Sequence, residues 1–129
     1  MPEAAVHIVV GVDDDFRVRE SIQSLVESAG YAARMFSSAE EFLQSGALAG
    51  TLCLVTDVRM SGMDGIELQR RIRIERPQFP VNFISAHYDD EARQRALAGG
   101  AVAFLYKPFD AAELLGTIET ASNNVGEIK

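Results

Sequence analysis

Polar side chains that could do chemistry stand at the ends of four apolar runs in this sequence. Asp57 follows Leu52–Val55, a nearly continuous apolar stretch of the kind that forms a parallel strand covered on both faces. The other three runs end in, or are followed directly by, Asp13 and Asp14, Ser85, and Lys107. An isolated Asp at such a place would most simply begin a turn. Polar groups at all four ends are hard to assign to chance, and they indicate a binding or reaction site.

Three of these side chains are carboxylates, Asp13, Asp14 and Asp57, and carboxylates brought within a few ångströms repel one another. A bound cation would relieve that repulsion. Mg²⁺ suits an all-oxygen site, because it binds through one or two carboxylates, keeps several waters and often contacts a phosphate. The two histidines and the single cysteine are not spaced as transition-metal ligands. The acidic set therefore predicts a magnesium site.

Strands and helices are predicted to alternate along the chain from the period of the apolar residues. Predicted strands cover 6–12, 31–36, 52–57, 81–85 and 101–106. Predicted helices cover 16–29, a segment opened by the capping box of Ser38 and Glu41, 65–75, a segment capped by Asp89 or Asp90 that ends at Gly99, and 110–121. This alternation predicts a doubly wound α/β fold, in which helices cover both faces of a five-stranded parallel sheet. Such sheets bind ligands at the carboxyl ends of their strands.

Length and charge limit the class of protein. The 129 residues fit a single domain over 1–129, with a core at about 6–121 and a polar tail at 122–129 that is expected to fray or begin a linker. A net charge of −7 and a pI near 4.7 disfavour direct binding to nucleic acid or to an anionic membrane. No apolar run reaches bilayer length and no leader pattern is present, so we expect a cytoplasmic protein. The single cysteine, Cys53, is expected in the core.

The same residues stand in motifs that resemble a known family. The motifs are Asp13-Asp14, Asp57 followed by Met60 and Met63-Asp64-Gly65, Ser85-Ala86, and Lys107-Pro108-Phe109. In order and in position they closely resemble the receiver domain of two-component response regulators, over about residues 6–121. The resemblance implies a flavodoxin-like sheet of order 2-1-3-4-5 and a phosphoryl group received from a sensor histidine kinase. Local similarity is closest to receivers that regulate transcription, which implies a separate DNA-binding domain and a homodimer on phosphorylation.

By this resemblance Asp57 is the phosphoacceptor. Mg²⁺ would be bound directly by Asp14, through water by Asp13, by Asp57 itself and by the backbone carbonyl of Arg59. Lys107 would pair with the acyl phosphate. Phosphoryl transfer needs an in-line oxygen nucleophile and cations that neutralise charge, and these residues supply both. We expect only phosphorylation and dephosphorylation of the chain itself, and no enzyme that acts on other substrates.

The resemblance also implies a switch and a control of hydrolysis. Ser85 would hydrogen-bond the phosphoryl group, and Phe104, at the aromatic switch position, would then rotate inward. The Lys107–Pro108 bond is expected to be cis. Arg59 and His87 flank the path of water to the phosphoryl group, and we predict that their bulk slows hydrolysis. His87 is equally well explained as an exposed loop residue.

Some departures from the family and some alternatives stay open. Ser61 stands where the family commonly has a proline, which could loosen the loop after Asp57. Asp15 lengthens the acidic run, so the metal pair could be shifted by one residue, to Asp14 and Asp15. A phosphatase of the haloacid-dehalogenase type would carry a second Asp where Arg59 stands, and a Rossmann domain would need a glycine-rich turn after the first strand. The main alternative is a receiver-like module that signals without phosphate, and the intact set of site residues disfavours it.

Overall fold

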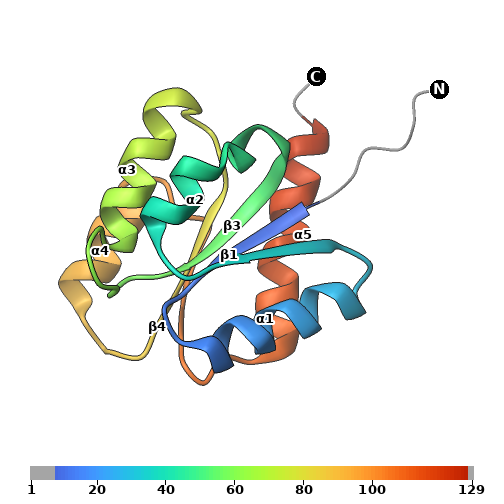
Figure 1. The fold of residues 1–129 in the computed structure, drawn as a ribbon, viewed down its shortest axis with the longest axis horizontal. Coiled ribbons are helices and arrows are strands. Elements are labelled where there is room, and N and C mark those ends of the chain that lie inside the picture. The colour runs from blue at the N-terminus through green and yellow to red at the C-terminus, as the bar shows by residue number, and fades with distance from the viewer. Residues whose placement is uncertain (1–7, 128–129) are drawn as a thin grey trace.

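The fold is built around a five-stranded parallel sheet. The computed structural model of the chain describes residues 8–127, with side chains through residue 122. The strands are β1 (Ile8–Val12), β2 (Ala32–Phe36), β3 (Thr51–Asp57), β4 (Val81–Ser85) and β5 (Ala103–Tyr106). Their order, β2-β1-β3-β4-β5, confirms the predicted topology (Figure 1). The predicted start of the first strand at Val6 lies outside the described residues.

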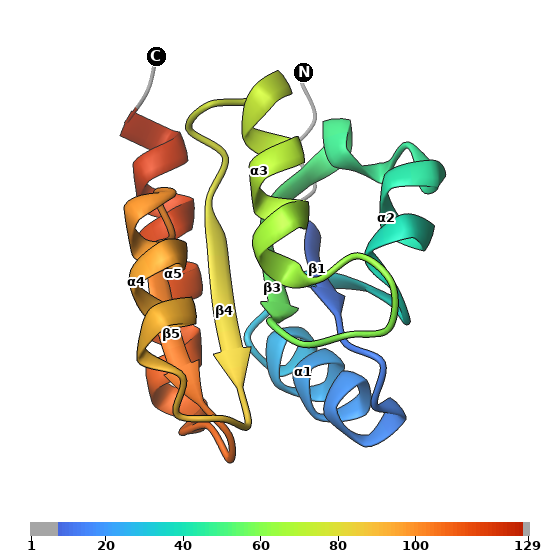
Figure 2. The ribbon, with the colours of Figure 1, turned by 90° about the vertical axis from the view of Figure 1, so that its left-hand side faces the viewer.

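Helices cover both faces of this sheet, as the doubly wound prediction requires (Figures 1 and 2). One face carries α1 (Phe16–Ser28) and α5 (Ala111–Glu127). The other face carries α2 (Ala39–Ser45), α3 (Gly65–Glu75) and α4 (Asp90–Ala98), and a short 3-10 helix, η1 (Ala47–Gly50), follows α2. The loops that leave the carboxyl ends of the strands therefore meet at one edge, between the two helical layers.

Two hydrophobic clusters lie on opposite sides of the sheet, and β3 contributes to both. Leu54 packs with Phe42 of α2 and Ile72 of α3, whereas Cys53 and Val55 pack toward α1 and α5. A strand covered on both faces has no solvent side, which explains why the sequence of β3 stays apolar almost to its end. Burial raises the pKa of the Cys53 thiol to about 12, so this side chain is an uncharged member of the core, as predicted.

All five α-helices begin at a polar residue whose side chain accepts a backbone N–H of the first turn. These N-caps are Asp15 of α1, Ser38 of α2, Asp64 of α3, Asp89 of α4 and Asp110 of α5. Asp89, and not Asp90, is therefore the cap of α4. The Ser38 hydroxyl accepts the Glu41 N–H at 3.0 Å, and the Glu41 carboxylate accepts the Ser37 N–H at 2.8 Å. The predicted start of α2 is confirmed, with the return bond of the capping box displaced to Ser37.

The ends of two elements, β5 and α5, differ from the prediction by two residues or more. β5 begins at Ala103, later than the expected Ala101. Helix α5 runs to Glu127, past the expected end at Ala121, so residues 122–127 are helical. No proline stands in that stretch, so the backbone has no steric reason to leave the helix at residue 121. Among residues 8–127 we find no helix with the length and apolar character needed to cross a bilayer.

Candidate functional site

The carboxyl ends of β1 and β3 bring three carboxylates together. Val12 of β1 pairs with Thr56 of β3, so Asp13 and Asp57 follow paired positions at the same edge of the sheet. The strands β1 and β3 themselves are labelled in Figure 2. Carboxylate oxygens of Asp13, Asp14 and Asp57 all lie within 4.8 Å of one another. Asp13 and Asp57 are buried and Asp14 is exposed. The structure thus assembles the predicted acidic set, and these oxygens could hold a metal ion.

Asp15 does not belong to this cluster. Its carboxylate accepts the Arg17 N–H at 2.9 Å and caps α1. Asp13 is held from two sides, because its carboxylate accepts the Asp15 N–H at 2.8 Å and its carbonyl accepts Nη1 of Arg19 at 2.7 Å. The structure therefore favours Asp13 with Asp14 over the shifted pair of Asp14 with Asp15.

Lys107 extends from the end of β5 into the acidic cluster. Its Nζ donates to Oδ2 of Asp13 at 2.9 Å and to Oδ2 of Asp57 at 3.2 Å. The Lys107–Pro108 bond is cis, as expected. Burial acts to lower the pKa of Lys107, but the hydrogen bond to Asp13 and the two carboxylate charges outweigh burial and raise it. Lys107 therefore keeps its charge and neutralises part of the acidic cluster.

Asp57 is a carboxylate in an environment that disfavours its charge. It is 7% exposed, and burial raises its pKa above the ordinary value for Asp. The neighbouring charge of Asp13 raises the pKa further, and Lys107 offsets these effects only in part. A poorly hydrated carboxylate oxygen next to a fixed ammonium is suited to act as a nucleophile toward an anionic substrate.

Two contacts hold the loop between β3 and α3. Gly65 lies so close to the end of β3 that a Cβ atom there would collide with the Asp57 carbonyl oxygen. Glu40 of α2 accepts the Met63 N–H at 2.9 Å, and this hydrogen bond lowers the pKa of the Glu40 carboxyl. The loop that carries Ser61 in place of the usual proline is thus anchored by Glu40. Sequence reasoning missed this anchor.

Ser85 ends β4 beside the cluster, where its neighbour Ile84 pairs with Asp57. The Ser85 hydroxyl donates to the His87 carbonyl at 3.0 Å and accepts the His87 N–H at 3.1 Å. In this conformation Ser85 therefore closes a turn with the backbone of His87. Its predicted contact with a phosphoryl group would require the hydroxyl to turn away from that backbone.

Phe104 is already packed inward in the structure. Its ring stacks on Phe83 of β4 with centroids 5.9 Å apart, and it meets Tyr106 edge-on at 5.5 Å. No inward rotation of Phe104 is needed from this conformation, which differs from the expectation. The outer aromatic residues are instead Tyr106 and the exposed Tyr88, which stack with centroids 4.2 Å apart. Sequence reasoning missed this pair, because Tyr88 lies in a loop and carries no periodic signal.

Arg59 and His87 lie on the two loops that flank the carboxylates. Nη2 of Arg59 is 2.8 Å from Oδ2 of Asp89, so its side chain reaches from the loop after β3 to the start of α4. His87 is exposed. Their effect on hydrolysis stays a prediction. The pairing of Arg59 with Asp89 was not foreseen, because each residue has a simpler local explanation, as a loop cation and as a helix cap.

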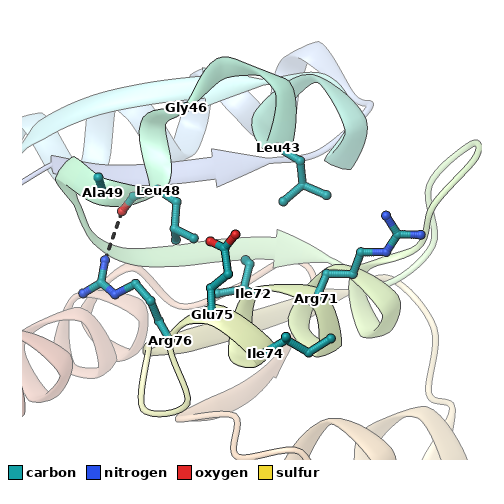
Figure 3. Close-up of a pocket in the computed structure, with 9 residues that line it drawn as sticks. All are labelled: Leu43, Gly46, Leu48, Ala49, Arg71, Ile72, Ile74, Glu75 and Arg76. Atoms are coloured by element: carbon teal, nitrogen blue, oxygen red, sulfur yellow. Dashed lines mark hydrogen bonds between the residues drawn. The ribbon is translucent and has the colours of Figure 1, made fainter.

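A pocket of about 570 Å³ lies elsewhere, between α2, η1 and α3 (Figure 3). Nη1 of Arg76 donates to the Leu48 carbonyl at 3.1 Å across it. The residues that line it precede β3 or end α3, so the pocket lies at the amino ends of β3 and β4. Because Asp57 stands at the opposite edge of the sheet, this pocket takes no part in the site.

Known proteins place the chain in a family. The sequence model of one protein family, the response regulator receiver domain, matches residues 9–119 of this chain. The transcriptional regulatory protein FixJ of Bradyrhizobium diazoefficiens is 40% identical over 115 residues, which cover 89% of this chain and 56% of FixJ. The response regulator protein TmoT of Ectopseudomonas mendocina is 41% identical over 114 residues, which cover 88% of this chain and 52% of TmoT. The chain therefore spans about half the length of these curated relatives.

Solved structures agree with this assignment. The receiver domain protein of Clostridium thermocellum superposes with a TM-score of 0.90 at 25% identity, covering 96% of this chain and 100% of that one. The response regulator StyR has a TM-score of 0.86 at 40% identity, covering 95% of this chain and 62% of StyR. All the carboxylates of the cluster, together with Ser85 and Lys107, fall within the matched residues 9–119. The chain belongs to the response regulator receiver domain family.

Proposed function

We propose that this chain is a phosphorylation-controlled receiver in which Asp57 takes a phosphoryl group from a sensor histidine kinase. The observation that carries the proposal is the buried Asp57 carboxylate, 3.2 Å from Nζ of Lys107 and grouped with the carboxylates of Asp13 and Asp14. An acceptor oxygen, a fixed ammonium and a set of metal ligands are the parts that phosphoryl transfer requires. No second function has a comparable grouping of residues among those that the structure describes.

In the proposed reaction an Asp57 carboxylate oxygen attacks the phosphorus atom of the kinase phosphohistidine, in line with the bond between this phosphorus and the histidine nitrogen. The new O–P bond forms an acyl phosphate while the N–P bond breaks, and the nitrogen leaves with the electron pair. Lys107 keeps its ammonium beside Asp57, where it attracts the negative charge of the phosphoryl oxygens. Ser85 would donate its hydroxyl to one of those oxygens after transfer.

Mg²⁺ is the proposed cofactor. It would be held by Asp14, by Asp57 and by the Arg59 carbonyl, with Asp13 acting through water, and when bound it would neutralise charge on the phosphoryl oxygens. The donor set is all oxygen, as Mg²⁺ prefers. Three carboxylates and one ammonium leave an excess of two negative charges, which a divalent cation would balance.

The output is proposed to run through a partner surface. Some relatives of this chain, FixJ and NtrC, are named as transcriptional regulators, and this chain matches about half of FixJ. We infer that a separate DNA-binding domain reads the phosphorylation state, and that phosphorylation favours a homodimer. The net charge of −7 makes this domain itself a poor ligand for DNA. A cytoplasmic location, and catalysis limited to the chain's own phosphoryl group, complete the proposal.

A small phosphodonor provides the test. Acetyl phosphate with Mg²⁺ is expected to label the parent chain transiently, and Asp57→Asn is expected to abolish labelling, because an amide is not a nucleophile. Asp64→Asn is a matched control that keeps the cap of α3 and should label normally. Steady release of phosphate without a labelled intermediate would indicate a phosphatase. Undiminished labelling of Asp57→Asn would exclude Asp57 as the acceptor, and a parent that takes no label would indicate signalling without phosphate.

A further inference from the structure

One ion pair links the phosphoacceptor loop to the start of α4. Nη2 of Arg59 lies 2.8 Å from Oδ2 of Asp89, and the two side chains are 58% and 33% exposed. Arg59 follows Asp57 by two residues, on the loop after β3, whereas Asp89 stands at the end of the loop after β4. The contact therefore joins the two loops that border the acidic cluster.

Each of the two carboxylate oxygens of Asp89 accepts a hydrogen bond from a different residue. Oδ1 accepts the Ala92 N–H at 3.0 Å and caps α4, and Oδ2 accepts from Arg59. The cap fixes the position of the carboxylate, and the carboxylate in turn fixes where the Arg59 guanidinium lies.

Phosphorylation would introduce a second anion on Asp57, two residues before Arg59 in the chain. A phosphoryl group brings about −1.5 to −2 charges, and a guanidinium binds phosphate through paired hydrogen bonds. Lys107 is already shared between Asp13 and Asp57. Arg59 pairs with Asp89, outside the acidic cluster, so it can change its partner without breaking the cluster and at the cost of one exposed contact.

We propose that Asp89 is a positioning residue for the phosphoryl chemistry, because it holds the Arg59 guanidinium away from Asp57 and competes with the phosphoryl group for it. This inference rests on the proposed function of Asp57. In the unphosphorylated chain, the pairing keeps a bulky cation out of the path of the phosphodonor. In the phosphorylated chain, Arg59 leaves Asp89 in a fraction of the molecules and shields the phosphoryl group from water there. The size of this fraction sets the lifetime of the phosphoryl group.

The test compares dephosphorylation rates of variants labelled with acetyl phosphate. Asp89→Asn removes the charge that holds Arg59 but keeps the cap, because Asn caps a helix as well as Asp does. We expect this variant to lose its phosphoryl group about two- to fivefold more slowly, the range that a weak exposed ion pair allows. In an Arg59→Gln background the same Asp89→Asn change is expected to leave the rate unchanged, since no guanidinium remains to be released.

Asp90→Asn is the matched control. It removes one exposed carboxylate next to Asp89 that bonds Gln94 and not Arg59, so its rate should equal that of the parent. The proposal would be overturned if Asp89→Asn slowed dephosphorylation by the same factor in the Arg59→Gln background as in the parent. It would also be overturned if Asp90→Asn slowed dephosphorylation as much as Asp89→Asn does. In either case the loss of a negative charge or a structural change would explain the rate. Thermal unfolding of each variant shows whether α4 is intact. A parent chain that takes no label would overturn the function of Asp57 and this inference together, whereas normal labelling with unchanged lifetimes would overturn this inference alone.

Discussion

A single ammonium group organises the chemistry of the site. Nζ of Lys107 contacts both buried carboxylates, Asp13 at 2.9 Å and Asp57 at 3.2 Å. One positive charge shared by two anions cannot fully satisfy either, and the exposed Asp14 adds a third negative charge. The site therefore carries an excess of negative charge, which favours the binding of a divalent cation.

The raised pKa of Asp57 gives a prediction for folding stability. The folded chain holds the Asp57 proton more tightly than the unfolded chain does, because the pKa of Asp57 is raised on folding. The stabilisation of the fold by the protonated carboxyl is therefore fully present below the unfolded pKa of Asp57. It is lost as the pH rises through the folded pKa. The ionised Asp57 is thus expected to destabilise the fold at neutral pH. Asp57→Asn should raise the Tm at pH 7 in metal-free buffer, and the difference from the parent should shrink toward pH 3.

Thermal unfolding at both pH values checks this expectation. Asp90→Asn, at an exposed carboxylate, is the control and should leave the Tm nearly unchanged. A lower Tm for Asp57→Asn at pH 7 would mean that its ion pair with Lys107 outweighs burial and the charge of Asp13.

Metal affinity separates Asp14 from Asp15. Asp14 belongs to the acidic cluster, whereas the Asp15 carboxylate caps α1. Asp14→Asn is expected to weaken Mg²⁺ binding by about tenfold or more, since even an outer partner of a metal site contributes that much. Asp15→Asn keeps the cap and should change the affinity little. Titration of Mg²⁺ measures both, and the opposite order would restore the shifted pair of Asp14 and Asp15.

At the scale of elements, the sequence predicts where most helices begin. Ser38, Asp64 and Asp89 are small polar residues in front of apolar periods, and each caps a helix in the structure. The cause is local, because the cap satisfies N–H groups only two or three residues away. The end of α5 was mispredicted, since polar residues after Ala121 do not by themselves stop a helix.

Contacts between elements could not be predicted in the same way. Glu40 bonds Met63 across 23 positions, and Arg59 bonds Asp89 across 30. Each depends on the distance between loops that only the assembled sheet defines. The site residues were predictable because the carboxyl ends of parallel strands always share an edge, but their hydrogen-bond partners were not.

Two glycines provide a prediction about how α3 and α5 are placed. Gly65 starts α3 against the Asp57 carbonyl, and Gly116 lies in α5 with open space around its Cβ position. Gly65→Ala should lower the free energy of unfolding by about 1–3 kcal/mol, because the helix must shift to admit a methyl group. Gly116→Ala should raise the free energy of unfolding by about 0.5–1 kcal/mol, because alanine loses less backbone entropy than glycine when the helix forms. Urea denaturation measures both, and a stable Gly65→Ala variant would show that α3 can move freely.

At the scale of the whole molecule, the sheet joins the site to the surface formed by α4, β5 and α5. Lys107 directly follows β5, and the loop after β4 runs from Ser85 through the exposed Tyr88 to α4. Tyr88 stacks on Tyr106 of β5, so a change at Ser85 has a direct route to this surface. Arg93 of α4 and Glu113 of α5 are exposed, whereas Arg95 lines a groove between α4 and α3, on another side of α4. Asp110 accepts the Ala112 N–H at 2.8 Å and is partly committed to the start of α5.

The last prediction is that phosphorylation strengthens self-association through this surface. Ser85 must leave the His87 backbone to reach the phosphoryl group, which breaks the turn that leads to Tyr88 and α4. Since Phe104 is already inside, we expect the loop and the pair of Tyr88 and Tyr106, and not Phe104, to move. Coupling of about 1–3 kcal/mol would strengthen a symmetric dimer about 5- to 150-fold.

Sedimentation with and without beryllofluoride, a stable mimic of the phosphoryl group, measures this change in association. Ser85→Ala should still bind the mimic, because Asp57 and Lys107 are intact, but it should gain less association, because no hydroxyl links the phosphoryl group to the loop after β4. Tyr88→Ala tests the surface itself, since it removes an exposed ring without touching the site, and it should weaken the dimer of the activated chain. An association constant that the mimic leaves unchanged in the parent would place the output on another surface or with another partner.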